Sequence, residues 1–140
     1  ICGKPMNAKI VRAILVTFIC LLALGSASAN AQNEVINNVR DALKTGSSRE
    51  LSKYLNNTVE ISINGEKSSY SRNQAEFVLR DFFNKFPSQG FRYVHQGSSK
   101  EGLKYTVGTY SYDRGEFRVF MLIKQIGGTY LVDKIDFNEE

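Results

Sequence analysis

The sequence predicts an α+β domain, with helices in its first half and an antiparallel sheet in its second half. Residues 90–137 contain four runs rich in β-branched and aromatic residues, separated by short segments with glycine, and this pattern is typical of a β-meander. Residues 34–86 contain three segments with apolar residues at helical spacing and one short hairpin. Helices followed by a run of antiparallel strands are the order expected of an α+β fold.

The predicted meander consists of residues 90–97, 102–112, 116–126 and 129–137. Gly127-Gly128 predicts a two-residue turn, and Asp113-Arg114-Gly115 predicts a three-residue turn in which Gly115 takes a positive φ. These turn lengths place Val94, Leu103, Tyr105, Val107, Val119, Met121, Ile123, Tyr130 and Val132 on one face. They place Phe91, Tyr93, His95, Thr106, Gly108, Tyr110, Phe120, Leu122, Leu131, Ile135 and Phe137 on the other. An error of one residue in a turn would exchange the faces of a strand.

The segment before the meander contains the predicted helices and a hairpin. Two short helices are expected at Glu34–Lys44 and Arg49–Leu55, and a hairpin turning at Asn64-Gly65 joins strands 59–63 and 66–70. Ser71 and Gln74 form a capping-box pattern that begins a longer helix at residues 72–86. Its apolar side carries Phe82, Phe83 and Phe86, so we expect this helix to cover the sheet. The predicted order is α-α-β-β-α-β-β-β-β.

The first 31 residues are typical of a secretory signal peptide. Lys9 and Arg12 precede an apolar run of residues 13–24, and small residues follow it. Cleavage is expected after Ala29 or Ala31, with Ala31 favoured, and Met6 is the expected start, so that residues 1–5 lie upstream of it. The apolar run is shorter than the roughly 20 residues that a membrane-spanning helix needs. We therefore expect a single domain, residues 32–140, that is periplasmic or secreted and has no stable membrane span after cleavage.

Two details of this leader bear on other protein classes. Cys20 follows large apolar residues where a lipoprotein signal has small ones, so a lipoprotein is the less favoured alternative. Cys2 and Cys20 are the only cysteines, so the mature domain has no disulfide, no thiolate nucleophile and no cysteine metal site. The leader also holds three of the 18 basic residues and no acidic residue, which leaves 15 basic and 14 acidic residues. A net charge of +1 without a basic stripe argues against nucleic-acid binding.

The candidate site residues are few, and each also has a purely structural interpretation. His95 is the only histidine and could serve as a general base, although no acidic residue is clearly placed to orient it. Ser98 and Ser99 lie in a loop whose backbone could bind an anion but whose composition is that of a plain hairpin loop. The predicted register places Tyr110 opposite Arg118 as a cation–π pair, and Gly108 opposite the ring of Phe120. The complete set of candidate ligand-binding residues is Tyr93, His95, Ser98, Ser99, Tyr110, Arg118 and Asp133; no catalytic set, metal site or cofactor is predicted.

Several short segments resemble a secreted family of unknown function found mainly in Bacteroidota. They are Asn64-Gly65-Glu66, residues 70–76, Asp81-Phe82-Phe83, residues 95–99, residues 105–108 and Arg118-Val119. The resemblance implies a nuclear-transport-factor-2-like, or cystatin-like, cone, in which N-terminal helices pack on a curved antiparallel sheet with a possible pocket at the open end. It implies no reaction, although isomerases and dehydratases of that fold use a cavity Asp with a Tyr or His.

Two functional hypotheses follow. The favoured one is non-enzymatic binding of a small apolar ligand or a protein partner, because no clear acid–base pair is present. The alternative is a small isomerase or lyase that uses His95 with Asp133 or a tyrosine. Since both faces of the predicted sheet are apolar, a homodimer through the sheet is also expected, with Tyr105, Val107, Val119, Met121 and Ile123 at its interface. The alternative is a monomer in which the two short helices cover this patch.

Overall fold

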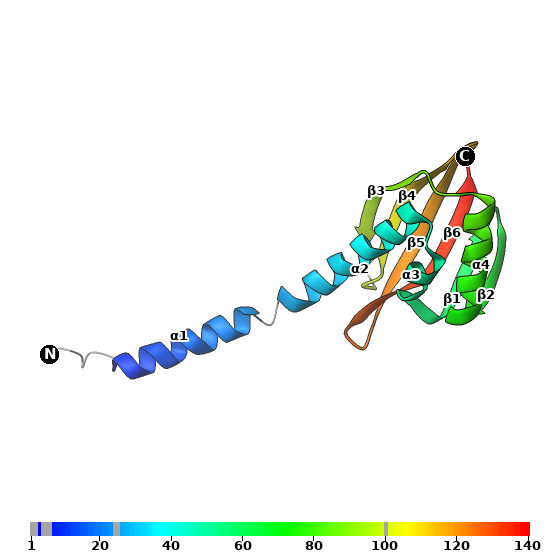
Figure 1. Ribbon diagram of the computed structural model, residues 1–140. Coiled ribbons are helices and arrows are strands. Elements are labelled where there is room, and N and C mark those ends of the chain that lie inside the picture. The colour runs from blue at the N-terminus through cyan, green and yellow to red at the C-terminus, as the bar shows by residue number, and fades with distance from the viewer. Residues whose placement is uncertain (1–2, 4–6, 24–25, 100) are drawn as a thin grey trace.

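The computed structural model describes residues 3, 7–23, 26–99 and 101–140. It shows a curved six-stranded sheet with helices on one side (Figure 1). The elements are α1 (Ala8–Ala23), α2 (Ser26–Thr45), α3 (Ser48–Ser52), β1 (Leu55–Ile63), β2 (Glu66–Ser71), α4 (Arg72–Lys85), β3 (Gly90–Ser98), β4 (Lys104–Tyr112), β5 (Gly115–Ile126) and β6 (Thr129–Glu139). The predicted α+β class and the order of the domain's elements are confirmed.

The strands lie in the order β2-β1-β6-β5-β4-β3. Neighbouring strands pair antiparallel except β1 and β6, which are parallel. The sheet is therefore mixed, and the prediction of a wholly antiparallel sheet is wrong at this one pair. The reason is that the meander returns its last strand to the side of the N-terminal hairpin, where β6 runs in the same direction as β1.

Helix α4 forms as the sequence predicts. The Ser71 side chain accepts a hydrogen bond from the Gln74 backbone, and the Gln74 side chain accepts one from the Ser71 backbone. The buried side of the helix presents Ala75, Leu79, Phe82 and Phe83 to the sheet. The predicted second helix is shorter than expected, because the chain has already entered β1 at Leu55, which pairs with Val132.

The N-terminal region is helical in α1 and again from Ser26 onward. Figure 1 shows α1 lying apart from the sheet. In the described part of the chain, none of the helices combines the length and the apolar character needed to cross a membrane. Residues 24–25 and the side chains of residues 18–30 lie outside what the structure describes, so signal-peptide cleavage after Ala29 or Ala31 stays a prediction.

Two of the three predicted hairpin turns are confirmed. Asn64-Gly65 and Gly127-Gly128 both have positive φ at their two central residues, as a primed two-residue turn requires. At the third turn Tyr112 pairs with Gly115, so only Asp113 and Arg114 lie between the strands, and Gly115 is not among the residues with positive φ. The predicted three-residue turn is wrong, and the shift of one residue exchanges the faces assigned to β5.

Two bulges change the faces further. The register of β3 shifts between Tyr93 and His95, leaving Val94 unpaired and 63% exposed. The register between β5 and β6 shifts so that Asp133 is skipped. The face covered by helices, the inner face, therefore carries the buried residues Val59, Ile61, Phe91, Thr106, Tyr110, Phe117, Val119, Met121, Ile123, Tyr130, Val132, Ile135 and Phe137. His95, Phe120, Leu122 and Leu131 lie on the opposite, outer face.

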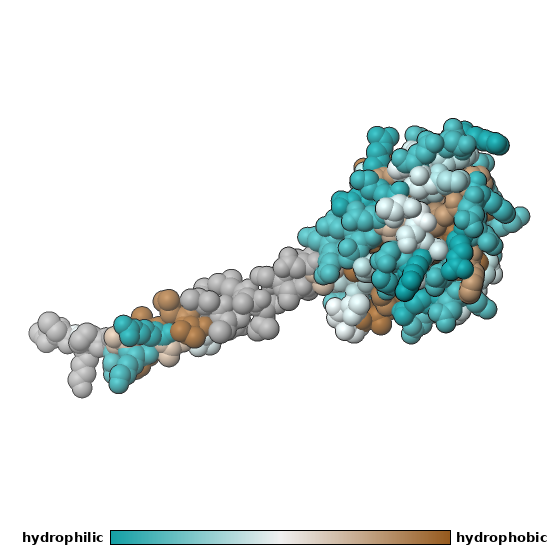
Figure 2. All heavy atoms as spheres, viewed as in Figure 1, coloured by the Kyte–Doolittle hydropathy of each residue, from teal (hydrophilic) through white to brown (hydrophobic). Residues whose placement is uncertain are grey.

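The core lies between α4 and the inner face and is rich in aromatic rings. The ring of Phe82 lies 4.2 Å from that of Phe137, 5.1 Å from that of Phe117 and 5.5 Å from that of Tyr110. These contacts fill the space where an open cone would have its cavity. Figure 2, viewed from the helix side, shows a mostly hydrophilic surface over this core.

Candidate functional site

The outer face of the sheet carries an apolar patch. Strand pairing places Leu122 beside Tyr105 in one row and Phe120 beside Val107 in the next, and Leu131 extends the patch on β6. All five side chains are half-buried by their neighbours in the sheet. We call these residues (Tyr105, Val107, Phe120, Leu122 and Leu131) the outer patch. Among the described residues, the three helices that pack on the sheet lie on its other side (Figure 1).

An aromatic row crosses three strands of this face. The His95 Nε2 and Tyr105 hydroxyl lie 3.2 Å apart, and the rings of Tyr105 and Phe120 are nearly parallel with centroids 6.4 Å apart. Tyr105 lies flat over Gly97, since a Cβ at Gly97 would come within 2.4 Å of the tyrosine Cζ. Glycine at this position therefore allows the ring to lie along the sheet.

Charged residues border the outer patch on the β1–β6 side. Lys134 Nζ lies 3.3 Å from Glu60 Oε1 and 3.7 Å from Asp136 Oδ2. The negative charge of Asp136, followed by the hydrogen bond with Glu60, raises the pKa of Lys134 above its usual value. Lys134 is therefore a cation that lies between two carboxylates. Lys134 pairs with Leu122 across β5 and β6, and Asp136 pairs with Phe120, so this charged group borders the outer patch.

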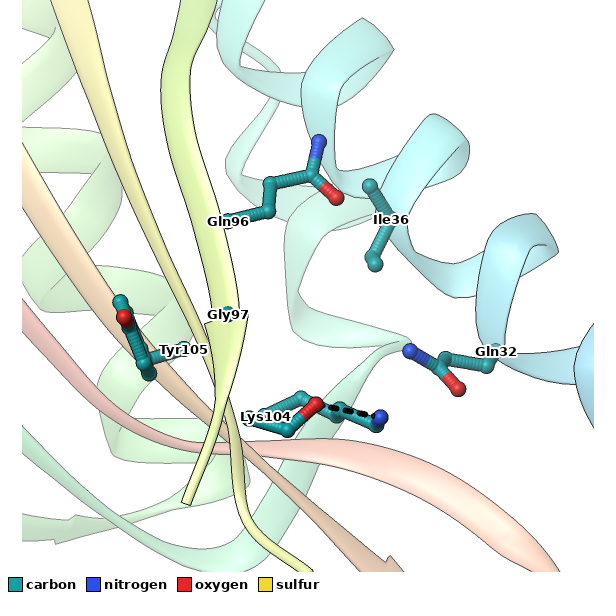
Figure 3. A pocket seen from close by; sticks show the side chains of 7 residues that line it. Gln32, Ile36, Gln96, Gly97, Lys104 and Tyr105 are labelled. Carbon is teal, nitrogen blue, oxygen red and sulfur yellow. Dashed lines mark hydrogen bonds between the residues drawn. The ribbon is translucent and has the colours of Figure 1, made fainter.

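A second candidate site is a hollow of about 200 Å³ between α2 and the ends of β3 and β4 (Figure 3). It is lined by Gln32, Ile36, Gln96, Gly97, Ser98, Lys104 and Tyr105. The Lys104 ammonium donates a hydrogen bond of 2.6 Å to Ser98 Oγ. Figure 3 shows the Tyr105 side chain on the far side of the strands from Gln32 and Ile36, so the polar groups of the hollow face α2.

His95 and Asp133, the pair of the alternative enzymatic hypothesis, are not brought together. His95 lies on β3 and Asp133 on β6, with β4 and β5 between them, a separation of roughly 14 Å at the usual strand spacing. The Asp133 carboxylate instead accepts a hydrogen bond of 3.0 Å from the Asn56 amide and lies 3.9 Å from Lys124 Nζ. Asp133 is the extra residue of the bulge in β6 and is left out of the β5–β6 pairing. Its contacts with Asn56 and Lys124 therefore give it a structural role.

The other predicted site residues are spread over different surroundings. Tyr93 donates a hydrogen bond of 2.7 Å to the carbonyl of Ile36, which fixes α2 against the sheet. Ser98 lies at the hollow, whereas Ser99 closes the loop through its backbone, which donates to the Leu103 carbonyl. Of the seven predicted residues, Ser98 lines the hollow, while His95 beside Tyr105 and Arg118 two residues before Phe120 border the outer patch.

Two predicted contacts are wrong because of the shifted β4–β5 register. Tyr110 is fully buried and pairs with Phe117, while Arg118 forms an ion pair of 2.6 Å with Glu140. Gly108 lies opposite Val119, and the ring that covers it belongs to Phe91, whose Cζ would lie 2.5 Å from an added Cβ. The prediction of an aromatic ring over the backbone of Gly108 is correct, but the ring is that of Phe91 on β3 and lies on the inner face.

Sequence reasoning missed the hollow. Gln32 lies at a predicted cleavage boundary, and Lys104 follows a loop whose length did not indicate that its side chain would face a helix. The pairing of Ser98 with Lys104 at the ends of β3 and β4 is the signal that could have suggested this contact. Among the described residues, no cluster of three or more His, Cys, Asp or Glu could hold a metal ion.

The fully buried Tyr110 and the half-buried Tyr93 are expected to make the domain sensitive to alkaline pH. Burial raises the pKa of Tyr110 to about 12 and also raises the pKa of Tyr93. A group with a raised pKa in the folded state stabilises the fold below its unfolded pKa of about 10, and this contribution is lost as the pH rises through the folded value. We therefore expect the urea midpoint to fall between about pH 10 and pH 12, and to fall less in Tyr110→Phe. If the urea midpoints of the wild type and of Tyr110→Phe fell equally over this pH range, this assignment would be wrong.

Comparison with known proteins places the chain among bacterial proteins of unknown function. A structure from Bacteroides ovatus ATCC 8483 is 31% identical, with a TM-score of 0.70 over 74% of this chain and 93% of that chain. One from Bacteroides fragilis YCH46 is 29% identical, with a TM-score of 0.70 over 74% of this chain and 96% of that chain. Both are described as DUF4783 family proteins. No curated protein matches the chain significantly.

More distant structures show the fold. An NTF-2 like protein of unknown function from Silicibacter pomeroyi DSS-3 is 10% identical, with a TM-score of 0.59 over 80% of this chain and 95% of that chain. The likeness confirms the nuclear-transport-factor-2-like fold that the resemblance implied. The profile of the family described as "Domain of unknown function (DUF4783)" matches residues 36–138, and the chain belongs to this family.

Proposed function

We propose that this protein is an exported, non-enzymatic binding domain that recognises a protein partner through the outer face of its sheet. The observation that carries the proposal is the outer patch, in which two aromatic and three aliphatic side chains lie together on the face opposite the helices. Apolar patches of this kind on an otherwise polar surface mark interaction sites. The aromatic filling of the core favours a protein partner over a small apolar ligand inside the cone.

A second copy of the chain is the partner that this face fits. A two-fold axis along the boundary between β4 and β5 would lay β4 of one copy on β5 of the other. Leu122 would then meet Tyr105, and Phe120 would meet Val107, so that apolar side chains cover each other. The same operation brings the β3 side of one copy to the β6 side of the other, with His95 approaching the acidic Asp136. Apolar rows in the middle, with a histidine at one margin and a carboxylate at the other, make the face self-complementary.

The predicted dimer interface of Tyr105, Val107, Val119, Met121 and Ile123 needs correction in this proposal. Val119, Met121 and Ile123 are fully buried on the inner face and cannot meet a partner. Phe120, Leu122 and Leu131 take their place, because the shorter turn at Asp113-Arg114 turns the alternate residues of β5 outward.

The proposal is tested by native mass spectrometry of the purified protein and of Phe120→Lys. The wild type is expected to appear as a dimer, and Phe120→Lys as a folded monomer, because each lysine would be buried against the apolar Val107 of the other copy, with a second like charge nearby across the axis. The same spectrum gives the polypeptide mass, which reports cleavage after Ala29 or Ala31.

The matched control is Phe77→Lys. Phe77 is a phenylalanine of α4 that is 61% exposed on the helix side, so the same change in charge should leave the dimer intact. A wild type that remains monomeric at high concentration would exclude the second copy as the partner, as would equal dissociation of both variants.

The alternative of a small isomerase or lyase receives less support. An acid–base mechanism needs its groups within hydrogen-bond reach of one substrate, and His95 and Asp133 are separated by two strands. The nearest polar neighbour of His95 is Tyr105, on the open outer face rather than inside a cavity.

A further inference from the structure

The hollow in Figure 3 contains a positive charge without an acidic partner in the described part of the chain. Lys104 is half-buried, and within the described residues its ammonium donates a hydrogen bond to the Ser98 hydroxyl. Lys134 differs, since two carboxylates surround it. An ammonium group has three donor hydrogens and no acceptor. Two of the Lys104 donors therefore remain available to a bound group.

Two side-chain amides line the same hollow. Gln32 approaches from α2 and Gln96 from β3, and neither forms a hydrogen bond with another of the residues drawn in Figure 3. Each amide offers two N–H donors. The ammonium and the amides therefore supply donors from three directions, and none of the described residues that line the hollow is a carboxylate.

The remaining wall is apolar. Ile36 is 7% exposed and lines the hollow where α2 meets β3. The volume of about 200 Å³ is below the roughly 300–1,000 Å³ of sites for drug-sized ligands. A ligand that fits is small and negatively charged at one end, with a short apolar remainder at the other.

We propose that this hollow binds a small monocarboxylate. Its carboxylate would accept hydrogen bonds from the Lys104 ammonium and the Gln32 and Gln96 amides, and its short apolar tail would lie against Ile36. A carboxylate is preferred to a phosphate because, of the described residues that line the site, Lys104 is the one cation, and a single positive charge matches a single negative one. This site lies on the helix side, so it goes beyond the partner surface proposed above and does not depend on it.

The test is an NMR titration of the purified protein with pentanoate, with the side-chain amide signals of Gln32 and Gln96 as the readout. We expect saturable shifts of both signals with pentanoate, weaker binding of acetate because it lacks the tail, and no saturable shift with the neutral pentanamide. Lys104→Gln should weaken pentanoate binding roughly tenfold, since it removes a hydrogen bond from a charged donor. Gln96→Leu, a second variant that keeps the lysine, should weaken it to a lesser extent.

The matched control is Lys67→Gln, which removes an exposed lysine of β2 on the far edge of the sheet. It should bind pentanoate as tightly as the wild type does. Shifts that do not saturate, equal binding of pentanamide, or equal loss in the Lys104 and Lys67 variants would overturn the proposal. Phe120→Lys should retain pentanoate binding, so failure of the partner proposal and failure of this one give different results.

Discussion

Val119→Lys is expected to destabilise the domain by about 3–5 kcal/mol, because it places an uncompensated charge in the core. Val119 is fully buried on the inner face, between Gly108 on β4 and Phe137 on β6. None of these neighbours carries an acidic side chain that could pair with the ammonium. Urea denaturation followed by circular dichroism would show the loss as a lower midpoint, or as a protein unfolded without denaturant.

The neighbouring residue provides the control for this prediction. Phe120 is next on β5 and faces outward, so Phe120→Lys should unfold at nearly the wild-type urea midpoint under conditions where both proteins are monomeric. If Val119→Lys were instead as stable as Phe120→Lys, the assignment of faces on β5 would be reversed, and the register that begins at Asp113-Arg114 would be wrong.

Phe82→Ala should destabilise the domain by about 3–5 kcal/mol, because removing a buried phenylalanine ring leaves a cavity that the surroundings refill only in part. Phe82 is 2% exposed. Its ring packs against those of Phe83, Phe86, Tyr110, Phe117 and Phe137. The surrounding rings come from α4 itself, from β4, β5 and β6, and from the segment after the helix, so relaxation at one contact would disturb several others.

Phe77→Ala is the matched substitution on the same helix. Phe77 is 61% exposed and touches Arg80, whose guanidinium carbon lies 5.0 Å from the ring centroid. Its loss should cost less than about 1 kcal/mol. Similar urea midpoints for the two alanine variants would mean that α4 does not cover the sheet as described.

The sequence was sufficient to predict the elements and most of the turns, because these depend on local chemistry. Gly127-Gly128 and Asn64-Gly65 require positive φ at both central positions, and glycine and asparagine tolerate it at low cost. Ser71 and Gln74 satisfy each other's backbone groups within one helical turn. Such signals involve neighbouring residues only, so they can be predicted without knowledge of the fold.

The faces of the sheet could not be predicted in the same way. Asp113-Arg114-Gly115 is compatible with turns of two or three residues, and the choice depends on which side chains of β5 the helices cover. The bulges at Val94 and Asp133 add one residue each without any distinctive residue type. A turn or bulge that differs by one residue from the prediction exchanges the faces of the strand that follows it. The shorter turn at Asp113-Arg114 therefore puts Tyr105 and Val107 on the face of Phe120, whereas the predicted turn put them on the face of Val119.

The candidate sites depend on contacts between distant segments, which residue types alone do not reveal. Gln32 and Lys104 are 72 positions apart in the chain, and they line one hollow only because α2 crosses the end of the β3–β4 hairpin. His95 was correctly chosen as unusual, but its partner is Tyr105 on the adjacent strand rather than an acidic residue.

The place of β6 in the sheet has a consequence for how the chain folds. Strand β6 lies between β1 and β5, so among the described strands it alone joins the first hairpin to the rest of the meander within the sheet. Pairing such distant segments closes a long loop, which slows folding relative to a sheet of sequential neighbours. A nascent chain in which Thr129–Glu139 has not yet been made lacks β6, so the two parts of the sheet cannot be joined before this strand is synthesised.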